Sequence, residues 1–226
     1  MRLAPLLFLI NVPVLANEFG WQEQMVKDGI TIEVRKVQGA KYREFRAVIE
    51  LQAKAAHAVA LLQDNAACAK WVLQCVSSEI IEVVNNTERY FHQITSLPFP
   101  ARSRDAVFHG TIHFDADQRI TIRLTSAHDR LPARRHVRIT KAHGSYHIEP
   151  NDTDTIRLTW QFYIDPAGAL PAFLVNSMVT DLPFHSLSAF RELVKQPPYK
   201  TATFIYDEYG APVKISLTAN NQPDDS

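Results

Sequence analysis

The middle of the chain consists of short runs in which β-branched and aromatic residues are interspersed with polar ones. Two runs, residues 30–37 and 43–51, come early, and six more follow residue 79, among them DAVFHGTIHFD, RITIRLTSA and DTIRLTWQFYID. This composition is typical of β-strands. Clusters of Gly, Asn, Asp and Pro separate the runs and favour short turns. We therefore expect an antiparallel sheet.

The first third of the chain predicts two helical regions. The residues before position 28 read as a short helical lead-in that ends at an Asp28-Gly29 turn, and the Ala-rich run AKAAHAVALLQDNAACAKWV predicts one helix or two short ones. Cys68 and Cys75 are the only cysteines. On one continuous helix their Cα atoms would lie about 10.5 Å apart, so a disulfide requires the helix to end between them. A disulfide and two buried thiols both remain open.

A further helix is predicted between Pro171 and Lys195, because proline suits a first helical turn and Pro197 ends the pattern. Pro183 removes a backbone donor, so we expect a kink or break near residues 179–182. These interruptions exclude a membrane span, but the helix can cover a curved sheet. Before the break, one apolar stripe is formed by Leu174, Val175, Met178, Val179 and Leu182.

Composition and charge narrow the class of protein. The chain has 226 residues, 46% of them hydrophobic, and 24 Lys plus Arg balance 24 Asp plus Glu, which is typical of one globular domain and disfavours nucleic acid as a partner. Residues 1–16 combine Arg2, an apolar run and small residues near Ala16. They predict a signal peptide and a periplasmic or secreted protein. The alternative is a cytoplasmic protein with a buried or frayed N-terminal segment. We assign residues 17–196 to the domain and residues 197–226 to a polar C-terminal extension.

The chain carries little that points to catalysis or metal binding. It has no G-x-S-x-G elbow, Gly-rich phosphate loop or H-E-x-x-H helix. His109 and His113 would lie about 13 Å apart on one strand, too far to chelate a single metal ion, and we expect neither metal nor cofactor. Arg89, Tyr90 and His92 either place polar groups inside the sheet or face solvent. A basic cluster, either solvated or directed at anionic head groups, consists of Arg130, Arg134, Arg135, Arg138 and Lys141.

The order of several short segments resembles the START family of lipid-transfer domains over residues 20–196. The matching segments are DGITIEVRK and REFRAVIEL near the start, Trp71 after the first helix, LPFPARSRDAV with Arg104-Asp105, HVRITKAHGSYHIEP, and TWQFYIDPAGALPAFLVNSM before the last helix. The resemblance implies an α+β helix-grip fold. In that fold a curved antiparallel sheet wraps around a long C-terminal helix and encloses a hydrophobic tunnel.

For function, the resemblance implies non-catalytic binding and transfer of one lipid, such as a sterol or phospholipid. We expect a monomer that contacts membranes transiently and whose tunnel is gated by residues 170–194, 115–119 and 128–135. The same helix residues could instead fill an ordinary core. The residues that we expect to contact lipid are Phe173, Leu174, Met178, Leu182, Phe190, Arg89, Tyr90 and His92.

Two other functions fit the same fold. A helix-grip enzyme of the polyketide cyclase type would need acid or base groups that converge in the tunnel, and the candidates are His92, His109 and Asp105. A lipid-sensing interaction module would use the residues after 196 to contact a partner. The position of the three ionisable side chains relative to the tunnel distinguishes the enzyme from the carrier.

Overall fold

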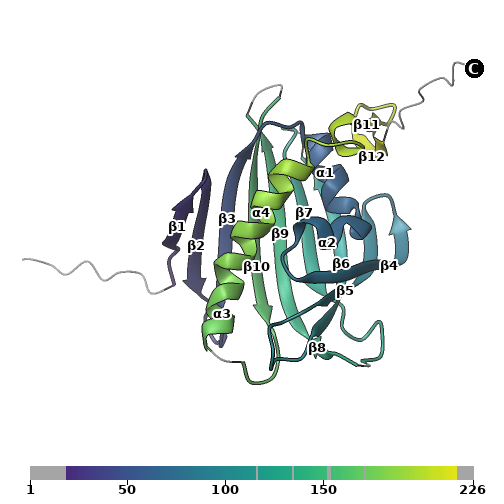
Figure 1. The fold of residues 1–226 in the computed structure, drawn as a ribbon. Coiled ribbons are helices and arrows are strands. Elements are labelled where there is room, and N and C mark those ends of the chain that lie inside the picture. Colours follow the sequence, from purple (N-terminus) through teal and green to yellow (C-terminus); the bar gives the residue numbers. More distant parts are fainter. Residues whose placement is uncertain (1–18, 116, 134, 152–153, 171, 218–226) are drawn as a thin grey trace, which may run out of the picture.

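The computed structural model describes residues 19–115, 117–133, 135–151, 154–170 and 172–217 (Figure 1). The predicted signal peptide and Arg134 of the basic cluster therefore lie outside the described residues. In the described part, ten strands form one sheet in the order β1-β2-β3-β10-β9-β7-β6-β5-β4, with β8 parallel to β6 and the other pairs antiparallel. The strands are β1 Gln22–Lys27, β2 Ile30–Lys36, β3 Arg43–Leu51, β4 Cys75–Asn85, β5 Glu88–Thr95, β6 Arg104–Phe114, β7 Ile120–Ser126, β8 Val137–Ile139, β9 Lys141–Pro150 and β10 Ile156–Asp165.

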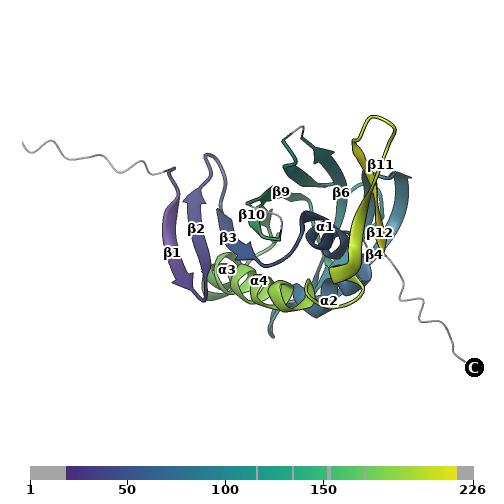
Figure 2. The same cartoon turned by 90° about the horizontal axis from the view of Figure 1, so that it is seen from above.

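The sheet is strongly curved, and two consecutive helices, α3 (Ala172–Val179) and α4 (Asp181–Leu193), lie across its concave side (Figure 2). This arrangement confirms the predicted α+β helix-grip fold. The predicted break is also present, because α3 ends at Val179 and α4 begins after Thr180. Pro183 falls in the first turn of α4, where a missing amide proton costs little. The buried face of α4 is formed by Pro183, Phe184, Ser186, Leu187 and Phe190.

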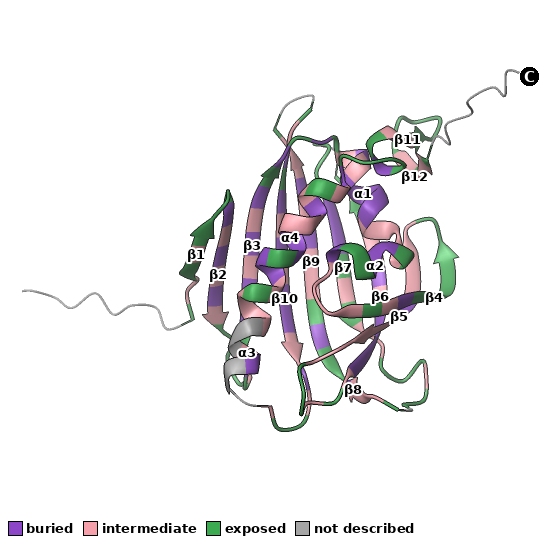
Figure 3. Cartoon of the chain, in the orientation of Figure 1, coloured by how far each residue is buried: buried purple, intermediate pink, exposed green. Residues whose placement is uncertain are grey.

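The segment before residue 28 is a strand and not the helical lead-in predicted from sequence. Asp28 and Gly29 both have positive φ, 51° and 74°, which is the geometry of a two-residue hairpin turn. This turn folds β1 back onto β2. The prediction was wrong because β1 is an exposed edge strand, whose conformation is set by its pairing partner and not by its own apolar pattern (Figure 3).

The Ala-rich region forms two short helices, α1 (Ala55–Gln63) and α2 (Cys68–Trp71), joined by a 3₁₀ turn, η1 (Asn65–Ala67). Because α2 ends at Trp71, Cys68 and Cys75 come within 6.0 Å of each other, Cα to Cα, and form a disulfide. The bridge ties α2 to the first residue of β4.

An aromatic cluster lies between the sheet and α4. Trp71 contacts both Phe190 and Trp160 edge to face, with ring centroids 5.1 and 6.2 Å apart, and Tyr146 stacks on Trp160 at 5.4 Å. The backbone amide of Leu73 donates a hydrogen bond to Ser186 Oγ (2.9 Å), which joins α4 to the chain that follows α2. Buried residues are concentrated in the central strands and in α1 and α4 (Figure 3).

The residues after 196 also contain ordered structure. A 3₁₀ turn, η2 (Tyr199–Thr201), leads into a hairpin of β11 (Ala202–Tyr206) and β12 (Pro212–Leu217), which packs beside α1. Tyr199 is buried, and its hydroxyl donates to Asp64 Oδ2 (2.7 Å). Among the described helices, none has the combination of length and apolar character that a membrane crossing requires.

Candidate functional site

Two adjoining cavities lie between the sheet and the helices. One, here the α1 cavity, holds about 80 Å³ beside α1 and η1, and the other, the α3 cavity, holds about 90 Å³ beside α3. Each is well below the roughly 300–1,000 Å³ of a typical small-molecule site. They share wall residues, so the two cavities lie side by side within the domain. The shared residues are Val72, Gln93, Leu124 and Tyr146.

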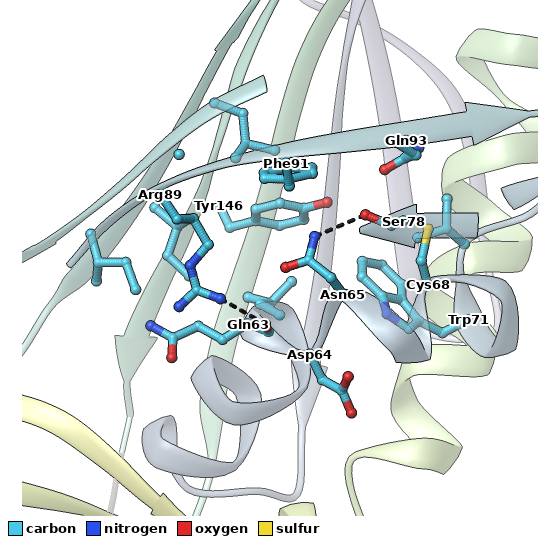
Figure 4. A pocket seen from close by; sticks show the side chains of 16 residues that line it. Gln63, Asp64, Asn65, Cys68, Trp71, Ser78, Arg89, Phe91, Gln93 and Tyr146 are labelled. Atoms are coloured by element: carbon cyan, nitrogen blue, oxygen red, sulfur yellow. Dashed lines mark hydrogen bonds between the residues drawn. The ribbon is translucent and has the colours of Figure 1, made fainter. Parts of the chain in front are cut away.

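The wall of the α1 cavity follows from strand alternation. Along β5, Arg89, Phe91 and Gln93 point into the cavity, because every second side chain of a strand lies on the same face (Figure 4). Gly110 on β6 faces the same space, where a Cβ atom would lie 3.3 Å from Leu124 Cδ2. The remaining apolar wall comes from Leu62, Trp71, Val72, Ile112, Ile122 and Tyr146.

Polar side chains are concentrated in the α1 cavity. Arg89 Nη1 donates a hydrogen bond to the backbone oxygen of Gln63 (2.9 Å), and Asn65 Nδ2 donates to Ser78 Oγ (2.8 Å) (Figure 4). Burial lowers the pKa of Arg89, although a guanidinium stays charged at neutral pH. Burial also raises the pKa of Tyr146, so its hydroxyl remains a potential donor. The cavity therefore offers several hydrogen-bond donors.

The α3 cavity is mostly aromatic and aliphatic. Its walls include Phe108, Trp160 and Phe162, and its one charged residue is Arg104. The Arg104 guanidinium donates to the backbone oxygens of Pro166 (3.0 Å) and Ala167 (3.1 Å), and to that of Arg102. Arg104 therefore holds the loop that leads into α3.

The structure divides the helix residues expected to contact lipid into two groups. Met178 and Leu182 line the α3 cavity. Leu174 and Phe190 are buried but lie outside both cavity walls, and Phe190 packs on Trp71. The side chain of Phe173 lies outside the described part of the structure.

The β5 residues are divided in the same way. Arg89 lines the α1 cavity, whereas Tyr90 and His92 lie on the outer face of the sheet. Tyr90 stacks on the ring of His109 at 4.6 Å, and the Arg130 guanidinium lies 4.0 Å from its centroid. His92 Nε2 lies 3.0 Å from Asp105 Oδ2.

The acid and base candidates for an enzyme are therefore all on the outer face. Asp105 contacts both His92 and Arg138, and the distance from Arg138 Nη2 to Asp105 Oδ2 is 2.7 Å. His109 Nε2 lies 2.7 Å from Glu88 Oε1. Burial alone opposes a charge on Asp105, but hydrogen bonds and charges from Arg138 and His92 outweigh it and hold its pKa below the usual range. No group of three or more His, Cys, Asp or Glu side chains in the described residues is placed to hold a metal ion.

The segments expected to gate the tunnel lie at different ends of the domain. The β6–β7 turn around residues 115–119 lies beside the C-terminal hairpin, where Phe114 contacts Phe204 at 5.7 Å. The loop at 128–135 lies at the end near β8 (Figure 1). There Arg138 donates to the backbone oxygens of His128 and Leu131, so this member of the basic cluster is already engaged.

One loop at the α3 end was missed. In the loop between β5 and β6, Leu97 lines the α3 cavity while Phe99 is 95% exposed. Arg102 Nη2 donates a hydrogen bond to the backbone oxygen of Arg135 (2.6 Å), which joins this loop to the loop at 128–135. The sequence signal for this loop is the run LPFP, because prolines on both sides of Phe99 favour a turn.

Other wall residues were missed as well, among them Gln93 and Tyr146, which line both cavities. Arg89, Tyr90 and His92 were all expected to contact lipid, but Arg89 lies an odd number of positions from Tyr90 and His92 and so cannot share a face of the strand with them. Alternation from Arg89 would have selected Phe91 and Gln93 in place of Tyr90 and His92.

Comparisons with known proteins agree with this geometry. A model of the START domain matches residues 13–198. An uncharacterized protein of Pseudomonas aeruginosa is 26% identical over 195 residues, which cover 86% of this chain and 95% of the relative. The crystal structure of a STAR-related lipid transfer protein from Xanthomonas axonopodis is 35% identical with a TM-score of 0.73, covering 78% of this chain and 99% of that one. Human STARD10 shares the fold, with a TM-score of 0.71 and 19% identity. The match covers 80% of this chain and 76% of the STARD10 chain.

Proposed function

Because the chain belongs to the START domain family, we propose that it binds a single lipid in the tunnel formed by the α1 and α3 cavities and transfers it between membranes without catalysis. The observation that carries the proposal is the pair of adjoining cavities with shared walls. His92, His109 and Asp105 all lie on the outer face, which supports a carrier over an enzyme.

A bound lipid requires more room than the two cavities now hold. Met178 on α3 and Leu182 in the first turn of α4 form the helical wall of the α3 cavity, on either side of the break at Thr180. Displacement of α3 about this break would widen the tunnel without moving the buried part of α4. Residues 172–182 are therefore the proposed gate, and Met178, Leu182 and Arg89 are the proposed lipid contacts.

The test is native mass spectrometry of protein purified from its own host, followed by lipid transfer between vesicles. We expect the mass of one chain plus one lipid. Leu182→Trp should fill the α3 cavity and lower both the bound fraction and the transfer rate. Glu192→Trp, on the exposed side of α4, is the matched control and should change neither. A protein that carries no lipid and takes up none from vesicles would overturn the proposal.

We further propose that the loop bearing Phe99 touches the membrane during transfer. A fully exposed aromatic side chain next to a cavity-lining Leu97 would place the tunnel mouth against the interfacial region of a bilayer, where aromatic rings are favoured. Phe99→Ser should slow transfer from vesicles and leave lipid binding in solution unchanged. Tyr209→Ser is the control, because Tyr209 is 87% exposed but lies on the hairpin at the opposite end. Equal effects of the two variants would contradict this role.

We also propose that the protein is exported to the periplasm or secreted. The Cys68–Cys75 disulfide supports this location, because such bonds persist in oxidising compartments. N-terminal sequencing of the protein from its host should give a mature chain that begins close to residue 17. An intact residue 1 in a cytoplasmic fraction would refute export without affecting the lipid-binding proposal.

A further inference from the structure

We propose that the α1 cavity is an oxyanion subsite, in which Arg89 pairs with the carboxylate or phosphate of an acidic lipid whose chain occupies the α3 cavity. This inference rests on the proposed lipid-binding function and adds the chemical class of the ligand. Fatty acids and lysophosphatidic acid share this chemistry: one negatively charged oxygen group joined to an apolar chain.

The first argument is the environment of Arg89. Its side chain lies in a wall that contains Phe91, Ile112 and Leu124, and its guanidinium makes one hydrogen bond, to Gln63 O, and no ion pair within the described residues. A guanidinium has five N–H donors, and a cation held in an apolar wall is costly unless it is paired. Arg89 therefore has unused capacity on the side that faces the cavity.

Arg104 provides an internal comparison. It also lines a cavity, but it donates to the backbone oxygens of Arg102, Pro166 and Ala167. With these three acceptors, the guanidinium of Arg104 holds the loop before α3. Among the described residues, the guanidinium of Arg89 has one acceptor, the backbone oxygen of Gln63.

The second argument is that no carboxylate in the described part of the chain pairs with Arg89. Asp64 is the one carboxylate among the residues that line the α1 cavity, and both of its oxygens have other partners. Oδ1 accepts from the Ala67 amide (3.2 Å) and Oδ2 from the Tyr199 hydroxyl (2.7 Å). Figure 4 shows the Asp64 carboxylate pointing away from the Arg89 guanidinium. A carboxylate or phosphate from a ligand would supply the missing charge.

The third argument is size and composition. The α1 cavity of about 80 Å³ exceeds the roughly 30 Å³ share of one water molecule and suits a small oxyanion, not a bulky head group. Donors from Gln93 and Tyr146 lie where the two cavities meet. Beyond them the α3 cavity is apolar, so an acidic group at Arg89 leaves the chain of the lipid against Phe108 and Phe162.

The experiment compares matched lipids on the full-length protein by competition with a fluorescent lipid. The probes are oleate, oleoyl lysophosphatidic acid, neutral monooleoylglycerol and inorganic phosphate. We expect the wild type to prefer at least one acidic lipid over the neutral one by roughly tenfold or more, the range expected for a hydrogen-bonded charge pair. Inorganic phosphate should compete only weakly. If it competes as well as the lysophospholipid, the cavity is a site for free anions and the inference is wrong.

The variants are Arg89→Leu, Arg89→Lys and the control Arg123→Leu. Arg123 lies on β7 but is exposed, so its replacement removes the same charge away from the cavity. Arg89→Leu should lose roughly tenfold or more in affinity for acidic lipid and keep its affinity for the neutral one, and Arg89→Lys should retain part of the preference. Arg123→Leu should match the wild type.

The outcomes separate the two proposals. Failure of every lipid to bind would refute the proposed function. Binding of neutral and acidic lipids with equal affinity, unchanged by Arg89→Leu, would refute the oxyanion subsite alone. If Arg89→Leu does not fold by circular dichroism, Arg89→Gln takes its place, because glutamine removes the charge but keeps a polar side chain. An acidic preference in Arg89→Gln identical to that of the wild type would also refute the subsite.

Discussion

On the outer face of β5 and β6, the ionisable side chains bind one another: Asp105 accepts from Arg138 and His92, and Glu88 pairs with His109. On the inner face of the same two strands, Arg89 has a single backbone partner and faces a cavity. The two faces are separated only by the alternation of side chains along a strand.

The difference shows how one pair of strands can serve two purposes. Charges that are satisfied within the protein stabilise the fold and leave little capacity for a ligand. A charge that the protein leaves without a counter-ion lowers stability on its own and becomes favourable when a ligand pairs with it. Substitutions on the outer face should therefore affect stability, and substitutions on the inner face should affect binding.

The largest effect is expected from Asp105→Asn on the outer face. The change leaves Arg138 largely buried without its counter-ion, and breaking a buried pair in this way costs about 3 kcal/mol. Urea unfolding should show this loss in the free energy of unfolding, while the folded variant keeps the lipid preference of the wild type. A loss below about 1 kcal/mol, or an altered lipid preference, would contradict the assignment of Asp105 to the fold.

The pH dependence of the same pair gives a second measurement. Because the pKa of Asp105 is lowered in the folded protein, its ionised form contributes stability above the unfolded pKa of about 3.9, and this contribution is lost as the pH falls through the lower folded value. The difference in unfolding free energy between wild type and Asp105→Asn should shrink as the pH falls below about 4. A difference that grows below about pH 4 would contradict the pairing.

A smaller stability effect, with a clear binding effect, is expected from Gly110→Val on the inner face. The new Cβ would lie 3.3 Å from Leu124 Cδ2 and 3.9 Å from Arg89 Cγ, and the branched side chain would fill part of the α1 cavity. We expect a cost of about 1 kcal/mol by chemical unfolding and a several-fold loss of lipid affinity in the competition assay. Unchanged lipid affinity would place the ligand outside the α1 cavity.

The smallest effect is expected from His109→Ala on the outer face. This residue pairs with Glu88 and stacks on Tyr90, but the side chains of His109 and Glu88 are 29% and 33% exposed, so the pair is screened by solvent. Thermal or urea unfolding should show a loss of about 0.5 kcal/mol, with lipid binding unchanged. A marked loss of lipid binding would break the distinction between the two faces.

Features set by short stretches of sequence could be predicted. The turn at Asp28-Gly29, the order of the strands after residue 79 and the break before Pro183 depend on backbone preferences of a few residues. Features that depend on distant partners could not. β1 is a strand because β2 pairs with it, and the C-terminal hairpin is anchored where Phe204 meets Phe114 of β6.

The candidate site follows the same division between local features, which could be predicted, and features that depend on distant partners, which could not. The helical stripe identified Met178 and Leu182, because one face of a helix is readable from its spacing. On β5, alternation divides the residues into two sets, but which set faces the cavities depends on how the sheet curves. Gln93 and Tyr146 lie on strands far apart in sequence and meet only in the folded sheet.

The C-terminal hairpin has a consequence for where the folding unit ends. The match to the START domain stops at residue 198, one residue before the buried Tyr199. A chain truncated at that border would lose the hydroxyl that binds Asp64 and would uncover the side of α1 that packs against η2, β11 and β12. Asp64 also accepts a hydrogen bond from the Ala67 amide of η1 and lines the α1 cavity. Loss of the Tyr199 hydroxyl would therefore also affect the wall of this cavity. We therefore expect the unit that folds on its own to include η2, β11 and β12, beyond the border that family resemblance alone would draw.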